Sequence, residues 1–275
     1  MNPIEAPLSK MVWAEINLDD LKKQIRAFEQ GDSYSLSVEY DAEHSLYVYR
    51  LKPNDVPPQI AAMAGDVVNN LRGTLDHLIW AIARMNVEHP FNRTCFPIYP
   101  EKITTWLNRR TGKTERRDNT REVGRVCQSL PPEAIDVVRA FQPYERGDDP
   151  FKDPLNVLND LWNMDKHRTI IPIAASALLP LFGSHPGFSV RYLNDGTVIF
   201  HIPESANPKV NFEPHISFRV AFPPTSPGDG SPVADLLDDL YETVANDVVP
   251  AFAGFFPKDV PATKWIVSRR RSWTQ

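Results

Sequence analysis

One short segment of the chain carries an arginine, an aspartate and a histidine at spacings that suit phosphate binding or proton transfer. The apolar residues around it recur every three or four positions, which predicts a helix over residues 59–85. At 100° per residue, Arg72 and Asp76 are stacked as an i, i+4 pair. His77 stands on the other flank of the same helix, so this one helix presents two separate polar edges.

A second polar cluster, Asp165 to Arg168, ends a helix that we expect over residues 153–168. Asp165 aligns with Leu161 and Trp162 on the apolar stripe of this helix, where an unpartnered carboxylate would cost several kcal/mol. It therefore needs a partner. If the two helices pack together, Arg72 or His77 is the natural one. The supporting residues of the candidate site are then Asp76, Asp165, His167 and Arg168.

Two residues of the long helix point to a close neighbour on its non-core face. Gly73 lies in mid-helix, where glycine costs about 1 kcal/mol relative to alanine, so we expect another group to approach closely there. Trp80 falls on the same line, and an exposed tryptophan is typical of a protein contact. We therefore expect a homodimer through the face bearing Gly73 and Trp80.

The six residues from Arg72 to His77 resemble the signature of the HEPN superfamily, an arginine followed after four to six residues by a histidine. These are helical domains, many of them metal-independent ribonucleases of toxin and phage-defence systems. The resemblance implies that Arg72 stabilises phosphate charge and that His77 is the general acid or base acting on an RNA 2′-hydroxyl. It also implies a site assembled across a homodimer. The leucine-arginine-x-x-leucine-aspartate-histidine and aspartate-lysine-histidine-arginine segments are similar to those of uncharacterised bacterial proteins with no assigned chemistry.

Two other interpretations of the same residues stay open. In the first, the protein is a non-enzymatic structural or partner-binding protein, and the Arg, Asp and His clusters form a buried stabilising network. In the second, Asp76, His77, Asp165 and His167 supply the ligand types of a divalent metal. Adjacent helical residues diverge by about 100°, so Asp76 and His77 do not converge on one ion. We expect neither a metal nor a cofactor.

Residues 108–126 are strongly basic and contain Thr111 and Gly112, which favours a mobile loop. Such a loop either holds the phosphates of RNA or is simply solvated. The candidate nucleic-acid contacts are Arg109, Arg110, Lys113, Arg116 and Arg117.

The remaining patterns predict an α+β fold. We expect a helix over residues 14–29, a β-hairpin over residues 33–51, and short helices at 101–108 and 132–141. Alternating and apolar runs predict a C-terminal β-meander of four strands, with Asn194-Asp195-Gly196 as one of its turns. The expected strands are 170–181, 188–193, 197–202 and 215–222, and a last helix covers 234–248.

Composition sets the class of protein. The chain has 275 residues, 42% hydrophobic and 24% charged, which excludes a disordered or fibrous chain. A net charge of −5 means that any nucleic-acid binding must be local. We expect one α+β domain over residues 1–275, with a helical portion at 1–168, a β-rich portion at 169–222 and a C-terminal helix and tail at 232–275. The chain has only two cysteines, no stretch of residues long and apolar enough to span a membrane, and no signal peptide in residues 1–30. These features predict a cytoplasmic protein.

Overall fold

The computed structural model of the chain describes residues 3–31, 33–167, 173–178, 189–192, 197–206 and 216–257. They form two compact units. Unit 1 comprises residues 1–19, 62–170 and 235–275, and unit 2 comprises residues 20–61 and 171–234. One division therefore falls next to residue 170, where the sequence predicts a change from helices to strands. The single-domain organisation stays a prediction.

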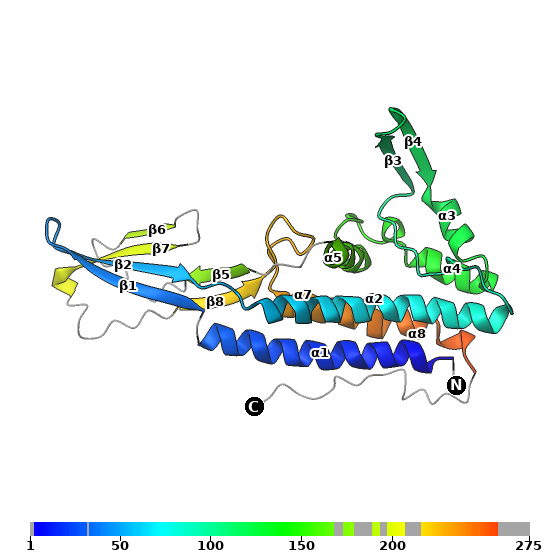
Figure 1. The fold of residues 1–275 in the computed structure, drawn as a ribbon, viewed down its shortest axis with the longest axis horizontal. Helices are drawn as coiled ribbons and strands as arrows, with labels where there is room; N and C mark the ends of the chain where they lie inside the picture. The colour runs from blue at the N-terminus through cyan, green and yellow to red at the C-terminus, as the bar shows by residue number, and fades with distance from the viewer. Residues whose placement is uncertain are drawn as a thin grey trace. The chain divides into compact units, whose positions relative to one another are not determined.

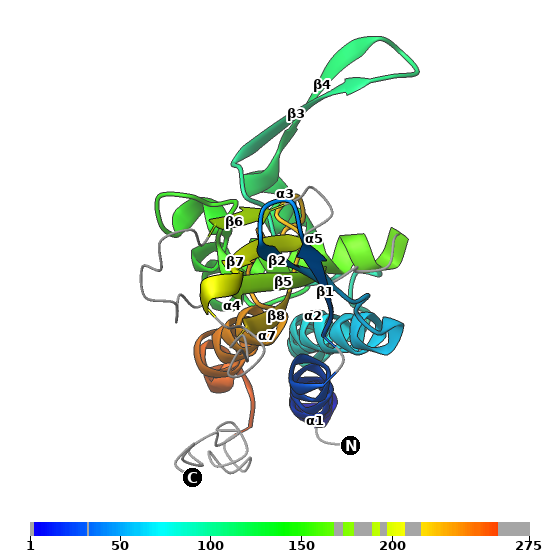
Figure 2. The same ribbon diagram turned by 90° about the vertical axis from the view of Figure 1, so that its left-hand side faces the viewer.

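The long helices are α1 (Glu5–Gln30) and α2 (Pro58–Asn86), and each contributes residues to both units. Unit 1 also contains α5 (Pro154–His167) and most of α7 (Val233–Glu242), which lies beside α1 and α2 (Figures 1 and 2). The remaining helical segments are α3 (Asn119–Val126), α4 (Pro132–Ala140), η1 (Pro143–Glu145), the π-helical η3 (Thr243–Val248), α8 (Val249–Ala251) and η4 (Ala253–Phe255). The structure thus confirms the helices predicted at residues 59–85, 132–141 and 153–168. The helix predicted at residues 14–29 begins earlier, at Glu5. Among the described residues, none of the helices combines the length and the apolar character that a membrane-spanning segment requires.

The apolar stripe of α2 forms the centre of the unit 1 core. Leu71, Leu75 and Leu78 are fully buried, as the helical period predicts. Met11 of α1 and Leu161 of α5 are buried as well. Removing this surface from water holds the helices together, and it fixes which polar residues of α2 and α5 face one another.

Unit 2 is built on antiparallel strands. A four-stranded sheet has the order β1 (Tyr34–Asp41), β2 (Leu46–Pro53), β7 (Val198–Pro203) and β6 (Ser189–Tyr192). A second sheet pairs β5 (Ile173–Leu178) with β8 (Ile216–Ala221), and the short η2 (Glu204–Ala206) follows β7. The α+β class and the hairpin are confirmed.

The strand order differs from a simple meander. β7 pairs with β2 of the N-terminal hairpin, and β5 pairs with β8. Tyr49 and Phe200 account for the first pairing, because their rings stack at 5.0 Å and both side chains are buried. The hairpin thereby covers apolar surface that a separate meander would leave open. The turn predicted at Asn194-Asp195-Gly196 lies outside the described residues.

The helix predicted at residues 101–108 and the mobile loop at 108–126 are wrong. β3 (Ile103–Asn108) and β4 (Lys113–Asp118) form an antiparallel hairpin with six residue pairs, and α3 follows it. Thr104, Thr105 and Trp106 have β-branched or aromatic side chains, which favour strands over a helix. The hairpin extends away from the helices of unit 1 in both views (Figures 1 and 2).

Candidate functional site

Arg72 of α2 is buried, and both terminal nitrogens of its guanidinium are hydrogen-bonded within the chain. Its side chain is 6% exposed; Nη1 donates to Asp76 Oδ1 at 2.7 Å and Nη2 donates to the Phe96 carbonyl at 2.8 Å. Asp76 Oδ1 also accepts the Phe96 backbone N–H at 3.0 Å. Arg72 and Asp76 therefore satisfy both backbone groups of Phe96 and attach the segment after α2 to the helix.

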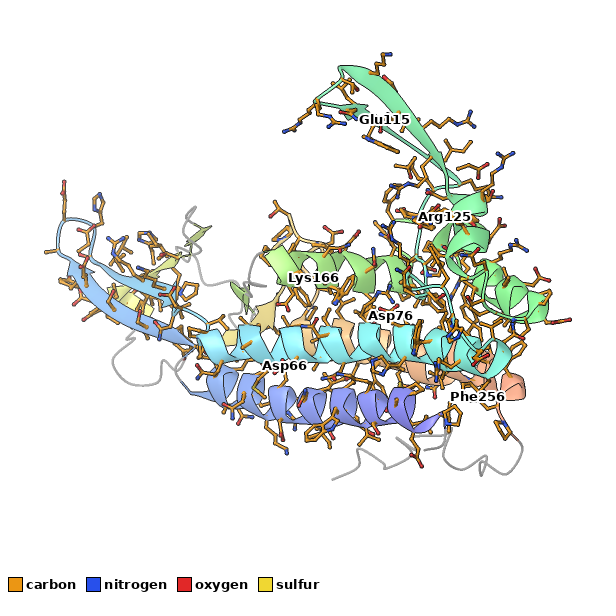
Figure 3. All side chains as sticks on the ribbon, turned by 45° about the vertical axis from the view of Figure 1, so that its right-hand side comes forward. Asp66, Asp76, Glu115, Arg125, Lys166 and Phe256 are labelled. Carbon is orange, nitrogen blue, oxygen red and sulfur yellow. The ribbon has the colours of Figure 1, made fainter. Side chains whose placement is uncertain are left out.

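The aromatic ring of Trp162 on α5 extends this cluster. The Arg72 guanidinium carbon lies 5.1 Å from the ring centroid, and Lys166 Nζ lies 3.0 Å from it. Figure 3 shows Asp76 on α2 and Lys166 on α5, on neighbouring helices. Arg72 Nε is buried and has no hydrogen-bond partner among the described residues, so its remaining stabilisation comes from the π face. Arg72 thus joins α2, α5 and the Phe96 segment. We call Arg72, Asp76, Phe96 and Trp162 the Arg72 cluster.

Asp165 does pack against α2, but its partner is neither Arg72 nor His77. Asn69 Nδ2 donates to Asp165 Oδ2 at 2.9 Å. The predicted partner is therefore wrong. Asp165 is half-buried, so an amide donor is enough to satisfy it where a fully buried carboxylate would require a cation. Gly65, one helical turn before Asn69, leaves the space that the carboxylate occupies.

His77 does not join Arg72. It is exposed on α2, and it makes no hydrogen bond or ion pair with any residue that the structure describes. Five helical positions separate the two residues by about 140°, and Arg72 is directed under Trp162. The arginine and histidine of the HEPN-like motif thus lie in different environments. The His167 side chain and Arg168 lie outside what the structure describes.

The close approach expected at Gly73 comes from the chain itself. A Cβ on this residue would lie 3.6 Å from the Lys10 side chain of α1, and Lys10 Nζ donates to Asn70 Oδ1 at 3.3 Å. Trp80 remains exposed. The expected dimer face is therefore partly occupied by α1.

The β3–β4 hairpin brings the five predicted nucleic-acid contacts together. Asn108 shapes its turn, because its side-chain oxygen accepts the backbone N–H of Arg110 at 2.9 Å and of Thr111 at 3.2 Å. Gly112 completes the turn at a φ of +66°, which glycine adopts without strain. Two arginines, Arg109 and Arg110, consequently stand at the tip of a defined ribbon.

The strands of the hairpin carry the other basic residues on both faces. Trp106 pairs with Glu115, and Thr104 with Arg117, so these residues share a face that also holds Lys113. The Arg117 guanidinium carbon lies 5.4 Å from the centroid of the Trp106 ring. Arg116 is opposite Thr105 on the other face. Residues 103–118 contain five basic and two acidic side chains, a local charge of +3 on a chain whose net charge is −5.

The acidic residues at the base of the hairpin are neutralised locally. Asp118 caps α3, and the hydrogen bond from the Thr120 hydroxyl lowers its pKa. The hydrogen bond from Arg125 lowers the pKa of Glu122. Figure 3 places Arg125 on α3, below Glu115. Glu115 itself accepts a hydrogen bond from the Asn108 amide. These three carboxylates are already engaged by neighbouring side chains, and no ion pair joins Arg109 or Arg110 to an acidic residue in the described chain.

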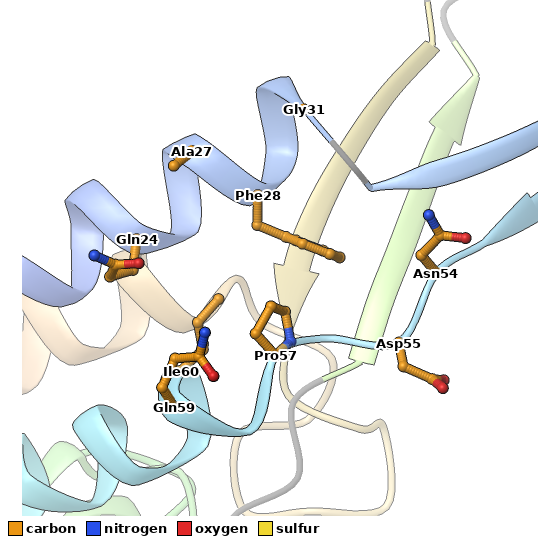
Figure 4. Close-up of a pocket in the computed structure, with 9 residues that line it drawn as sticks. All are labelled: Gln24, Ala27, Phe28, Gly31, Asn54, Asp55, Pro57, Gln59 and Ile60. Atoms are coloured by element: carbon orange, nitrogen blue, oxygen red, sulfur yellow. The ribbon is translucent and has the colours of Figure 1, made fainter.

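A pocket of about 380 Å³ in unit 2 lies between the end of α1 and the β2–α2 connection, and Phe28, Asn54 and Asp55 are among its lining residues (Figure 4). No residue of the predicted site lines it. Among the described residues, no three His, Cys, Asp or Glu side chains gather as metal ligands would.

Comparisons with protein-family models, curated proteins and solved structures found no match to this chain.

Proposed function

We propose that this protein binds single-stranded RNA through the β3–β4 hairpin and that the Arg72 cluster stabilises the fold without taking part in chemistry. The observation that carries the proposal is the hairpin itself: five basic side chains and an exposed tryptophan on one projecting two-stranded ribbon. Phosphate contacts by such side chains supply affinity without sequence preference.

Trp106 favours a single strand over a duplex. It is 37% exposed and lies next to Arg117, so an unpaired base can stack on the indole while the guanidinium contacts a phosphate. The major groove of an RNA duplex is too deep and narrow for side chains to read. The major groove of B-DNA does admit a two-stranded ribbon, so duplex DNA is the competing ligand.

Cleavage by Arg72 and His77, which the HEPN resemblance implies, has less support from this geometry. The Arg72 guanidinium is committed to Asp76 and the Phe96 carbonyl, and His77 is exposed elsewhere on α2. Incubation of a labelled RNA pool with the protein in EDTA, beside the His77→Ala variant, tests this role separately. We expect intact RNA with both proteins, whereas cleavage lost only in the variant would establish His77 as catalytic.

The binding proposal is tested by fluorescence anisotropy with a labelled 20-nucleotide single-stranded RNA at low salt. The hairpin variant replaces Arg109, Arg110, Lys113 and Arg116 by glutamine. A matched control variant makes the same change at four exposed basic residues outside the hairpin: Arg50, Lys52, Arg84 and Lys152. Both variants have the same net charge, so any difference in their RNA affinity is caused by where the four substituted residues lie.

We expect the hairpin variant to bind RNA at least about tenfold more weakly than wild type, and the control variant to stay within about twofold. Equal weakening in both variants would overturn the proposal, because net charge rather than the hairpin would then explain binding. Equal affinity for a duplex DNA of the same length would overturn the preference for a single strand.

A further inference from the structure

In the part of the chain that the structure describes, β1 is an edge strand of the four-stranded sheet. It pairs with β2 through eight consecutive residues, from Tyr34 opposite Pro53 to Asp41 opposite Leu46, and in the described chain no strand pairs with its other side (Figure 1). Native edge strands are commonly shielded by a lysine, a proline, a bulge or a very short length. β1 contains no lysine and no proline. Its pairing with β2 has no bulge, and the strand is eight residues long. The opposite edge strand, β6, has only four residues.

One side of β1 is also apolar and open. Leu36, Val38 and Tyr40 alternate along the strand and are 41%, 49% and 47% exposed. In the register they lie opposite Leu51, Tyr49 and Tyr47 of β2, so all six share one face of the sheet. Toward the middle of the sheet the same face is covered, because Leu51 and Tyr49 of β2 and Phe200 of β7 are buried. The apolar face therefore extends onto β1, where its side chains are exposed.

We propose that β1 pairs with β1 of a second copy of this chain, which joins the two four-stranded sheets into one continuous sheet across a two-fold axis. Antiparallel pairing of a strand with its own copy closes the assembly, because each subunit uses its long free edge once. The pairing continues the apolar row of one subunit directly into that of the other. The proposal concerns unit 2 and is independent of RNA binding by the hairpin.

The sequence of β1 restricts the register. Residues directly opposite share a face, so apolar residues meet apolar residues only when the two-fold axis passes through a residue and not between two. An axis at Glu39 would place two carboxylates opposite each other, which is unfavourable. An axis at Ser37 places Leu36 opposite Val38 and Glu39 opposite Ser35. An axis at Val38 places Leu36 opposite Tyr40 and Glu39 opposite Ser37. In both, the carboxylate faces a hydroxyl, and β1 is self-complementary.

The first test is the solution mass measured by sedimentation velocity from 1 to 100 µM. We expect a wild-type dimer that dissociates on dilution, and a Val38→Lys monomer with unchanged circular dichroism, since a lysine in an edge strand blocks pairing with another strand. Trp80→Lys is the matched control: it places the same charge at an exposed apolar residue on the face first expected to dimerise. A monomeric wild type at 100 µM, or dissociation by Trp80→Lys alone, would overturn the proposal.

The second test is disulfide cross-linking in a Cys95→Ser background, in which the buried Cys127 is the remaining cysteine. A cysteine on the two-fold axis lies opposite its own copy, so Ser37→Cys or Val38→Cys should form a covalent dimer under mild oxidation, depending on the register. A cross-linked dimer at neither position 37 nor position 38 would overturn the pairing.

Discussion

Asp165 on α5 lies so close to Gly65 on α2 that a Cβ on residue 65 would be 2.6 Å from Asp165 Oδ1. The two helices approach at this point because residue 65 has no side chain. The carboxylate then reaches Asn69, one turn farther along α2, and accepts a hydrogen bond at 2.9 Å. Gly65, Asn69 and Asp165 together form a second polar contact between α2 and α5, beside the stacking of Arg72 on Trp162.

Gly65→Ala should have effects of opposite sign in two backgrounds. In wild type it should destabilise the protein, because the new methyl group displaces Asp165 from Asn69. In Asp165→Ala, where the obstructing atoms are gone, it should stabilise the protein by about 1 kcal/mol, the helix-propensity difference between glycine and alanine. Urea unfolding of the four proteins of this double-mutant cycle measures the coupling. Equal effects in both backgrounds would show that the contact is not formed.

Arg72→Met should destabilise the protein by about 3 kcal/mol. The substitution keeps an apolar stem but leaves Asp76 and the Phe96 carbonyl without their charged donor, and breaking a buried pair in this way costs at the lower end of about 3–5 kcal/mol when one partner is half-exposed. Urea unfolding measures the change. His77→Ala, on the exposed side of the same helix, should stay within about 0.5 kcal/mol. A large loss for His77→Ala and none for Arg72→Met would contradict the role assigned to the Arg72 cluster.

The helices could be predicted because their apolar residues recur over many turns, as in α2, where Leu71, Leu75 and Leu78 mark the buried stripe. The α2–α5 contact could be anticipated from Asp165 on an apolar stripe. Its partner could not, because Asn69 and Asp165 are 96 residues apart and only the packed helices bring them together. The Phe96 carbonyl as an acceptor for Arg72 left no signal at all in the sequence.

The β3–β4 hairpin could not be predicted, for a different reason. Its strands have no buried face, so the alternation of apolar and polar residues that reveals a strand is weak, and Ile103, Trp106 and Leu107 are all exposed. The available signals were local: strand-favouring residues 103–106, and Asn108 with Gly112 as turn residues. The five basic residues could be grouped from their spacing in the sequence, whereas the two-stranded ribbon that carries them required the structure.

Alkaline pH should destabilise the protein through Cys127. Burial raises the pKa of its thiol to about 12, far above that of an exposed cysteine. The folded state therefore retains a proton that the unfolded chain releases, so this stabilising contribution is complete below about pH 8.5 and is lost as the pH rises toward 12. At pH 10 the loss from this one group should be between about 1 and 2 kcal/mol.

The Cys127→Ala variant isolates this contribution. It should be less stable than wild type at pH 7.5, because it leaves a small cavity, but its free energy of unfolding should fall less between pH 7.5 and pH 10. Urea unfolding at the two pH values gives the comparison. Parallel pH dependence in the two proteins would contradict a raised thiol pKa. Tyr99, whose pKa burial raises to about 12, is present in both proteins and cancels.

Trp106→Ala should weaken single-stranded RNA binding by about 1–3 kcal/mol if an unpaired base stacks on the indole. The substitution removes no charge, so the salt dependence of binding should hardly change. Anisotropy titrations at three salt concentrations separate the two effects. Trp80→Ala, another exposed tryptophan of unit 1, serves as the control and should leave the affinity unchanged. An equal loss in both variants would point to non-specific contacts with aromatic side chains.

The salt dependence of RNA binding tests the central claim most directly. The logarithm of the affinity should fall linearly with the logarithm of the salt concentration, by about 0.7 for each phosphate contact that a basic side chain makes to a single strand. In the variant with Arg109, Arg110, Lys113 and Arg116 replaced by glutamine, we expect the slope to become shallower by up to about 3, with the control variant matching wild type. An unchanged slope in the hairpin variant would show that these side chains do not contact RNA and would contradict the proposed function.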